Sequence, residues 1–289
     1  MGTNFDIVAY GTQREQLESA IADALREVKR LDCLLSNYRH DSELSNINRL
    51  GSREAMIVRS ELFEFLSRCS AYSELSEGTF DITVGPLVKA WGFYKGTGEL
   101  PQRNAVMEAL DKVGYRNMIL DEQNVTVKFA KDGMELDPGG IGKGFAVDKM
   151  AEILKSQGVD SALIVGGGST IYGFGSPPDE PGWKVTIKDP HHPSRVAETV
   201  TLKDEAISTS GDLEKFFWAD GKIWGHIIDP RTGYPASGTL SVSVIAPRSI
   251  DSEAWTKPYY ILGRFWTEKH KPNDFRVLYC EDQATCEWL

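Results

Sequence analysis

The stretch DPGGIGKGFAVD, from Asp137 to Asp148, combines four glycines, one lysine and two carboxylates, a set that packing alone does not explain. Apolar residues at helical spacing follow it, which predicts a loop leading into a helix N-terminus. Glycines there let the backbone adopt positive φ and approach a ligand, and the N–H groups of a first helical turn favour an anion. Lys143 adds a positive charge, although the stretch matches neither the Walker A loop nor the dinucleotide-binding glycine motif. We therefore predict an anion site of unspecified type, with a simple connecting turn as the alternative.

His226 is the histidine best suited to proton transfer. It opens the segment HIIDPRTGYP and precedes Asp229 by three residues, so the end of a strand could hold both side chains in one cleft. The alternative is a histidine that is satisfied at a strand edge. The adjacent histidines His191 and His192 have no Cys, Asp or Glu at metal-ligand spacing, which favours a polar surface loop.

Two further segments carry polar groups that could bind a ligand. Ser210, Gly211 and Asp212 are expected at the start of a helix, again a geometry that favours anions. Tyr38 lies in the polar segment from Ser36 to Arg49, where a tyrosine is either surface or a platform for a flat ring. Both interpretations of Tyr38 stay open.

The composition is that of a globular protein of 289 residues, with 41% hydrophobic and 26% charged residues. Its formal net charge of −10 argues against a general nucleic-acid binder, which needs a basic face for phosphates. No apolar run approaches the ~20 residues of a transmembrane helix, and no secretion signal is visible. Two of the four cysteines lie on apolar faces of predicted helices, whereas Cys280 and Cys286 could pair in an oxidising compartment.

Hydrophobic periodicity predicts the elements that must position these residues. A strand over Met1 to Tyr10 is followed by a long helix with an apolar stripe from Leu17 to Leu35, and a second helix carries Leu62 to Tyr72. The later elements are expected to be a short helix after Gly85-Pro86, a helix from Pro101, a hairpin turning at Glu122 to Asn124, the helix after the glycine stretch, a buried strand over Ser161 to Gly175 broken by three glycines, a strand over Trp183 to Lys188, a strand over Leu240 to Ala246, a helix from Glu253 to Leu262 and a strand over Phe275 to Cys280.

Six segments in this order and spacing resemble the FAD:protein FMN transferases, the ApbE-like family. They are MGT at Met1, SNYRHDSELSNINR, FDITVGPLVKAWGF, DPGGIGKGFAVD, STSGD and HIIDPRTGYP, and the resemblance covers nearly the whole chain. It implies a Mg²⁺-dependent transferase that splits the pyrophosphate of FAD, esterifies FMN onto a Ser or Thr hydroxyl of a target flavoprotein and releases AMP.

The resemblance also implies roles for particular residues. His226 would take the proton from the attacking hydroxyl, a task suited to a neutral imidazole with a pKa of about 6.5. Tyr38 would lie against a flat ring, and Asp137 would accept hydrogen bonds. The residues that match the family's FAD-binding positions are Met1, Tyr38, Thr79, Phe80, Asp81, Asp137, Lys143 and Ile227.

The implied metal site departs from the family pattern. The family's ligands are a backbone carbonyl matching Gly140, an Asp and, four residues later, a Thr, and the last two positions hold Glu253 and Lys257 here. Glutamate can ligate Mg²⁺, but a lysine ammonium has no lone pair. The two residues could form a surface helix pair worth ~0.3–0.5 kcal/mol, with the metal site lost. Alternatively Lys257 supplies positive charge to the pyrophosphate, or Asp251 or Thr256 restores a ligand in another helix register.

We expect an α+β protein with a mixed β-sheet core, surrounding helices and an FAD cleft lined by loops, over residues 1–289 as one domain or two intimately packed lobes. Its expected partners are FAD and an acceptor flavoprotein with a Ser/Thr flavinylation motif. A periplasmic or membrane-anchored location is expected if a leader was removed. The alternatives to transfer are a non-catalytic protein that binds or delivers FAD, and an FAD pyrophosphatase that gives FMN and AMP.

Overall fold

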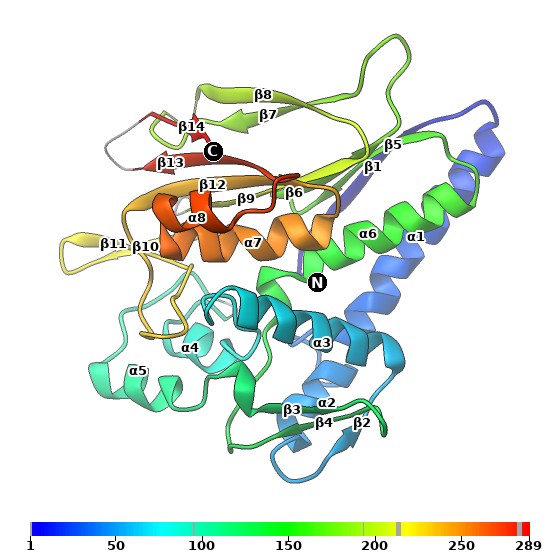
Figure 1. The fold of residues 1–289 in the computed structure, drawn as a ribbon. Helices are drawn as coiled ribbons and strands as arrows, with labels where there is room; N and C mark the ends of the chain where they lie inside the picture. The colour runs from blue at the N-terminus through cyan, green and yellow to red at the C-terminus, as the bar shows by residue number, and fades with distance from the viewer. Residues whose placement is uncertain (1, 95, 193, 212–214, 282–284) are drawn as a thin grey trace. The chain divides into compact units, whose positions relative to one another are not determined.

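A computed structural model describes residues 2–94, 96–192, 194–211, 215–281 and 285–289 (Figure 1). The chain forms two compact units, and each is built from segments that are distant in sequence. The first unit contains Met1–Leu31, Gly139–Gly211 and Gly238–Leu289, and the second contains Asp32–Pro138 and Asp212–Ser237. The predicted organisation, one domain or two packed lobes, stays a prediction.

The first unit is centred on a sheet whose described strands pair antiparallel throughout. The strands, in spatial order, are β1 (Phe5–Tyr10), β5 (Ser161–Gly166), β6 (Thr170–Phe174), β9 (Glu205–Gly211), β12 (Thr239–Ala246), β13 (Arg276–Glu281) and β14 (Glu287–Trp288). Both faces of the central strands are covered, so β12 is buried along almost its whole length instead of alternating.

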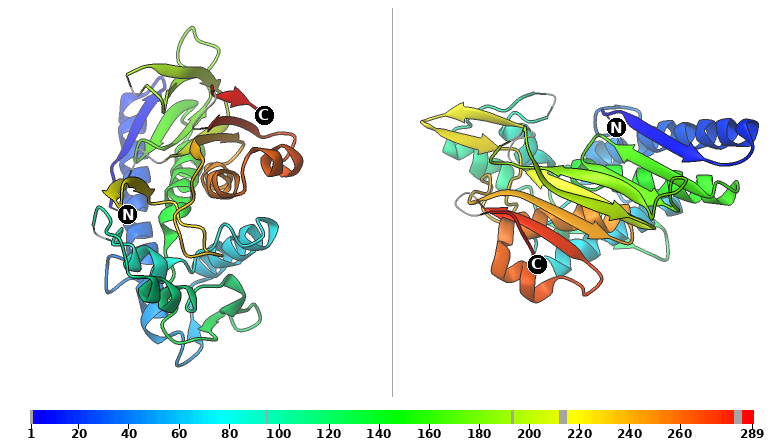
Figure 2. Two further views of the ribbon diagram at one scale, coloured as in Figure 1. Left: turned by 90° about the vertical axis from the view of Figure 1, so that its left-hand side faces the viewer. Right: turned by 90° about the horizontal axis from the view of Figure 1, so that it is seen from above.

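Helices cover one face of this sheet and a hairpin covers the other (Figure 1 and Figure 2). On the helical face, Ala162, Ile164 and Tyr172 pack in one core cluster with Met150 and Leu154. The helices of this unit are α6 (Gly142–Ser156), α7 (Ser249–Leu262), α8 (Arg264–His270) and the first part of α1 (Arg14–Leu35).

The hairpin on the opposite face consists of β7 (Trp183–Lys188) and β8 (Val196–Leu202). In β7 the residues alternate between buried and exposed, because successive side chains of a strand point to opposite faces. The buried ones, Trp183, Val185 and Ile187, pack in a second cluster with Ile245 and Leu278 of the main sheet.

The second unit is mainly helical. Its helices are α2 (Glu43–Leu50), α3 (Ser60–Leu75), α4 (Gly85–Ala90), α5 (Arg103–Leu110) and the 3₁₀ turn η1 (Tyr115–Asn117), and its strands are β2 (Met56–Ile57), β3 (Met118–Asp121), β4 (Thr126–Phe129), β10 (Phe216–Ala219) and β11 (Lys222–Gly225). An aromatic cluster holds the end of α4 against β11 and the segment that follows it. Trp91 packs on Trp224 of β11 and on Tyr234, and its indole N–H donates to the carbonyl of Gly233 at 2.8 Å.

The α+β class and most predicted elements are confirmed, and the differences have local causes. The expected single strand over Ser161 to Gly175 is a hairpin of β5 and β6, because Gly167 and Gly168 both take positive φ and turn the chain. The polar segment from Ser36 to Arg49 contains α2, whose N-cap Ser42 accepts a hydrogen bond from the N–H of Ser45 at 3.0 Å.

The expected helix start at Ser210 to Asp212 is wrong. Ser210 and Gly211 belong to β9, where they pair with Val242 and Ser241 of the buried strand β12, and Asp212 lies outside the described residues. A short polar sequence with a glycine predicts a helix start only when an apolar helical pattern follows, and partner strands outweigh that local signal here.

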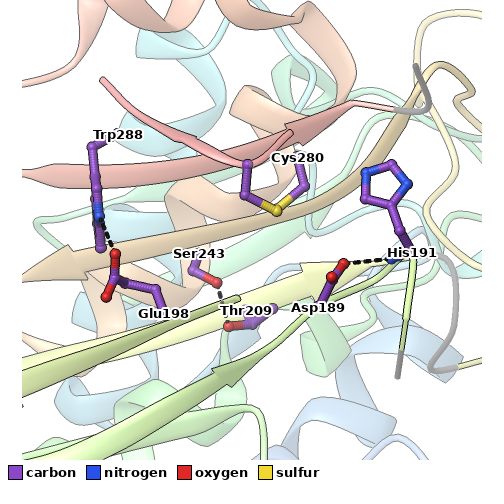
Figure 3. Close-up of a disulfide and its surroundings, with 8 residues drawn as sticks. Asp189, His191, Glu198, Thr209, Ser243, Cys280 and Trp288 are labelled. Atoms are coloured by element: carbon purple, nitrogen blue, oxygen red, sulfur yellow. Dashed lines mark hydrogen bonds between the residues drawn. A yellow bond between two sulfur atoms is a disulfide. The ribbon is translucent and has the colours of Figure 1, made fainter. Parts of the chain in front are cut away.

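The cysteines fall into two groups. Cys280 and Cys286 form a disulfide, with a Cα–Cα distance of 4.2 Å, which pairs the two residues that the sequence left open (Figure 3). Close to it, Trp288 of β14 donates to Glu198 of β8 at 3.3 Å. Cys69 is buried, as expected of a core residue, whereas Cys33 is exposed. In the described part of the chain, no helix combines the length and apolarity needed to cross a membrane.

Candidate active site

The glycine stretch is a 3₁₀ turn, η2 (Pro138–Gly140), followed directly by helix α6. Lys143 and Gly144 therefore lie in the first helical turn, as the sequence predicted. The four glycines of the stretch, all among the described residues, do not adopt positive φ, so the expected use of glycine for such a backbone is wrong. The reason is that these positions have become helical, where φ is negative for every residue.

The anion at the N-terminus of α6 is a side chain of the protein itself. Glu253 of α7 is 1% exposed, and its Oε2 accepts a hydrogen bond of 2.6 Å from the backbone N–H of Gly144. Its Oε1 forms an ion pair with the ammonium of Lys143. The predicted preference of this helix end for negative charge is thus met by an internal carboxylate.

Gly144 is needed for the close packing of α6 on α7. A Cβ at this position would lie 2.3 Å from the carbonyl oxygen of Ser249 and 2.9 Å from the Cα of Ile250. Both atoms belong to the backbone of the first turn of α7, so neither can rotate away as a side chain could. The glycine therefore lets the two helix ends approach until the N–H of Gly144 reaches Glu253.

The second carboxylate of the stretch, Asp148, caps α7. Its Oδ1 accepts from the N–H of Ser249 at 2.7 Å and its Oδ2 from the N–H of Ile250 at 3.1 Å, which satisfies two donors of the first helical turn. Burial raises the pKa of Asp148, although these backbone hydrogen bonds act in the opposite direction. Asp148 is therefore a structural residue, and nothing in its contacts indicates chemistry.

Lys257 lies one helical turn after Glu253 and is half-buried. Its ammonium donates to the backbone carbonyl of Glu253 at 2.9 Å. The expected surface pair of Glu253 and Lys257 is wrong, because the carboxylate is buried against α6. Thr256, the possible substitute ligand, is 0% exposed, and its hydroxyl bonds with Ser210 and with the carbonyl of Glu253, both at 2.8 Å.

The donors at the implied metal positions do not fit Mg²⁺. This ion needs about six oxygen ligands in near-octahedral geometry. Oε2 of Glu253 accepts from Gly144, Oε1 faces the ammonium of Lys143 as an ion pair without a hydrogen bond, and Lys257 presents an ammonium where the family pattern has a hydroxyl. Among the residues that the structure describes, no group of three or more His, Cys, Asp and Glu side chains could hold a metal ion either.

In the second unit, the segment with Thr79, Phe80 and Asp81 is buried and internally satisfied. The hydroxyl of Thr79 donates to the carbonyl of Ser76 at 2.7 Å, and Phe80 packs edge-on against the ring of Tyr72. The backbone N–H groups of Thr79 and Phe80 also donate within the segment, to the carbonyl and the hydroxyl of Ser76, each at 3.1 Å.

Asp81 organises the same segment. Its Oδ1 accepts from the backbone N–H and the hydroxyl of Thr83, at 2.8 and 2.7 Å, and its Oδ2 accepts from the N–H of Tyr115 at 2.8 Å. Burial raises the pKa of Asp81 against the effect of these hydrogen bonds. The carboxylate thus ties the segment to η1.

The structure brings Asp137 and Tyr38 into this same unit. The N–H of Asp137 donates to the carbonyl of Ile82 at 2.7 Å, which fixes Asp137 beside the buried segment. Tyr38 stacks on Tyr94, with ring centroids 4.9 Å apart and planes inclined by 10°. Burial, followed by the negative charge of Asp137, raises the pKa of the Tyr38 phenol. Tyr38 is therefore half of an aromatic pair and not an isolated surface residue.

Two contacts of the second unit were missed by the sequence analysis. Tyr94 supports Tyr38, and its hydroxyl donates to the carbonyl of Asn37 at 2.6 Å. An aromatic residue just before a glycine-containing polar loop was the available signal. The other is the contact of His226 with Lys215, for which the available signal was Asp220-Gly221: this dipeptide favours a hairpin turn, and in the hairpin of β10 and β11 Phe216 pairs with Gly225, one residue before His226.

His226 follows β11 directly. Its Nδ1 lies 3.2 Å from the carbonyl oxygen of Lys215, and a carbonyl can only accept, so Nδ1 carries the proton in this contact. Nε2 is then the nitrogen with the lone pair. The edge of Phe93 packs against the ring, with centroids 6.3 Å apart. Ile227, the next residue, is buried and its carbonyl accepts from the N–H of Ala236 at 2.9 Å.

Asp229 has a different role from the one expected beside His226. Its two carboxylate oxygens bind the guanidinium of Arg231 at 3.0 and 2.9 Å, and its Oδ1 also accepts from the N–H of Arg231. This pairing stabilises the turn that follows His226. The remaining FAD-binding candidate, Met1, lies outside the described residues.

The model of the ApbE family matches residues 1–272, nearly the whole chain. The chain belongs to the ApbE family. This confirms the family that the six segments predicted.

ApbE relatives resemble the chain in sequence and in structure. The FAD:protein FMN transferase of Klebsiella pneumoniae is 32% identical over 248 residues, which cover 85% of this chain and 76% of the relative. That of Treponema pallidum is 33% identical over 263 residues, covering 86% and 72%. The crystal structure of the ApbE protein of Thermotoga maritima has a TM-score of 0.90 at 31% identity, over 99% of this chain and 93% of the other. The flavin transferase ApbE of Vibrio cholerae has a TM-score of 0.85 at 27% identity, over 100% and 94%.

Proposed function

We propose that this ApbE-family protein is an FAD:protein FMN transferase, which moves FMN from FAD to a Ser or Thr hydroxyl of an acceptor flavoprotein and releases AMP. The names of its relatives support this function, since all of those cited are FAD:protein FMN transferases or ApbE proteins. The observation in this chain that carries the proposal is His226, whose contact with Lys215 leaves Nε2 as the basic nitrogen. The alternatives of flavin delivery and FAD hydrolysis are not favoured, because the relatives are transferases.

In the proposed reaction, the acceptor hydroxyl oxygen attacks the phosphorus atom of the FMN half of FAD. A new P–O bond forms to the acceptor, and the bond from that phosphorus to the bridging oxygen breaks. The electron pair of the broken bond leaves on the phosphate of AMP, and the hydroxyl proton passes to Nε2 of His226. A positioned base of this kind contributes a rate factor of about 10²–10⁴.

FAD binding is proposed for the positions that match the family. Tyr38, supported by Tyr94, offers a flat face for a ring, and Asp137 offers a carboxylate beside the buried segment. Thr79, Phe80 and Asp81 would act by fixing the shape of this segment, because their polar side chains and the N–H groups of Thr79 and Phe80 bond internally. Lys143 can pair with Glu253 and still donate to a phosphate, since an ammonium has three donors. Met1 and Ile227 complete the proposed set.

The finer predictions from the resemblance are Mg²⁺ dependence, an acceptor motif and export. A backbone carbonyl at Gly140 could ligate Mg²⁺, but the groups at Glu253 and Lys257 do not fit this ion, so no step of the reaction is assigned to a metal. The proposed acceptor carries the pattern Asp-x-x-Ser/Thr-Gly-Ala-Ser/Thr. A periplasmic or membrane-anchored location is proposed, and the Cys280–Cys286 disulfide supports an oxidising compartment.

Mass spectrometry tests the proposal. The purified protein is incubated with FAD and a domain or peptide carrying the acceptor pattern, and the acceptor is then weighed while AMP is quantified. We expect an acceptor heavier by one esterified FMN, together with one AMP for each adduct. FMN and AMP in solution without an adduct, across several acceptors, would identify a pyrophosphatase, and tight FAD binding without any AMP would identify a flavin-binding protein.

A further inference from the structure

The first turn of α6 and the second and third turns of α7 carry an unusual set of charges. Lys143 and Lys257 contribute two ammonium groups and Glu253 contributes one carboxylate, which gives these three side chains a formal net charge of +1. The positions that the family uses for a divalent cation are within this set. With a threonine at position 257, the charges of Lys143 and Glu253 would cancel. The net positive charge of the set therefore comes from Lys257.

Glu253 is held in this set by two independent contacts. The N–H of Gly144 donates to Oε2 at 2.6 Å, and the ammonium of Lys143 pairs with Oε1. The carboxylate is 1% exposed, so water cannot replace either partner without a movement of the helix ends. A metal bound by Glu253 would place a divalent cation beside the ammonium of Lys143 in a buried position, unless this ion pair is broken.

The ammonium of Lys257 opposes a divalent cation directly. It lies on the same side of α7 as Glu253, one turn later, and its donation to the Glu253 carbonyl at 2.9 Å holds it near the backbone of that residue. A cation bound by the carboxylate of Glu253 would therefore share this residue with the ammonium of Lys257, and like charges repel.

We propose that Lys257, held beside the Lys143–Glu253 pair, replaces the divalent cation in this protein and that FMN transfer runs without Mg²⁺. The proposal rests on the function proposed above. In it, Glu253 positions both lysines, and the ammonium of Lys257 supplies the charge that stabilises the FAD pyrophosphate and the departing AMP phosphate. Lys257 neither gives nor takes a proton, so the bonds that form and break are those of the transfer step described above.

Direct binding of Mn²⁺, followed by electron paramagnetic resonance, tests the metal part of the proposal without any activity measurement. Four proteins are compared: the wild type, Glu253→Gln, the double variant Glu253→Asp/Lys257→Thr and the control Lys269→Thr, which changes an exposed lysine of α8. We expect no Glu253-dependent Mn²⁺ site in the wild type or the control. The double variant is expected to gain a Mn²⁺ site, with an affinity at least about tenfold above any Mn²⁺ binding by the wild type.

Transfer in the presence of EDTA tests the catalytic part. We expect the wild type to release AMP at an unchanged rate in EDTA, and Lys257→Thr to lose about 100-fold under the same conditions. Stoichiometric Mn²⁺ binding by the wild type that Glu253→Gln abolishes would overturn the proposal, as would complete loss of transfer in EDTA with recovery on adding Mg²⁺. Absence of AMP under every metal condition would instead contradict the proposed function, and the Mn²⁺ titration would still decide whether the cluster excludes a metal.

Discussion

The carboxylate of Glu253 occupies the N-terminus of α6, where its Oε2 accepts a 2.6 Å hydrogen bond from the backbone N–H of Gly144. This contact joins two segments that are 109 residues apart in the chain. It explains how the N-terminus of α6 comes to hold a buried anion from the protein itself, and why Lys143 lies beside that anion. The contacts within each unit lead to four predictions, and a fifth concerns the proposed base His226.

Glu253→Ala should destabilise the protein, because it leaves the ammonium of Lys143 without its buried partner. The free energy of unfolding is expected to fall by about 3 kcal/mol, the lower end of the range for breaking a buried ion pair. Urea denaturation measures it. The control is Glu152→Ala, which removes the exposed pair with Lys149 and should cost less than about 1 kcal/mol. Equal losses in the two variants would show that the buried Lys143–Glu253 pair contributes no more stability than an exposed ion pair.

Gly144→Ala should also destabilise the protein, although alanine is the better helix former by about 1 kcal/mol. The added Cβ would meet the carbonyl of Ser249 at 2.3 Å, and forcing two backbones apart typically costs about 1–3 kcal/mol. Thermal denaturation measures the net effect, with Ser156→Ala on the exposed side of α6 as the control. A stabilised Gly144→Ala variant would contradict the close packing of α6 on α7.

The sequence predicted this region in part. The helix after the glycine stretch, its N-terminal preference for negative charge and the involvement of Lys143 all followed from local patterns. The identity of the anion did not, because Glu253 comes from a helix that is distant in sequence, and only the fold brings it there. The same reason applies to Asp148, whose role as a cap of α7 depends on packing between two helices.

Local signals were weakest where tertiary contacts decide the structure. Gly167 and Gly168 interrupt an apolar run, which we interpreted as a break in one strand, although a Gly-Gly pair between two such runs also favours a hairpin turn; their positive φ shows that turn. Ser210 and Gly211 resemble a helix start, but they pair with the neighbouring strand β12 and so belong to the sheet. Tyr38 could not be assigned from sequence, because its stacking partner Tyr94 lies in another loop.

Asp148→Ala should remove the cap of α7, at a cost of about 1–2 kcal/mol. The cost should depend on pH. Burial raises the pKa of Asp148 in the folded protein, so the stability it contributes is fully present below its unfolded pKa of about 3.9 and declines as pH rises through the folded pKa. Denaturation of both proteins from acid to neutral pH should show the largest difference in acid. A difference that grows with pH would contradict the raised pKa.

The phenol of Tyr38 should titrate above its ordinary pKa of about 10. Burial is the larger cause and the charge of Asp137 the next, so Asp137→Asn should lower the pKa of Tyr38 without restoring the ordinary value. NMR of protein labelled at the tyrosine ring carbons can follow this, with Tyr38→Phe to assign the signal. An unchanged pKa in Asp137→Asn would show that the two groups do not interact.

The His226→Ala variant tests the proposed base, because the transfer depends on one nitrogen of this residue. The wild type, His226→Ala and the control His270→Ala, which changes an exposed histidine of α8, are given FAD and acceptor, and the FMN adduct is followed by mass spectrometry over time. The flavin fluorescence of bound FAD is measured in parallel. The account predicts that His226→Ala binds FAD normally and forms the adduct about 10²–10⁴-fold more slowly, while the control is unaffected. An adduct formed at the wild-type rate by His226→Ala would contradict it.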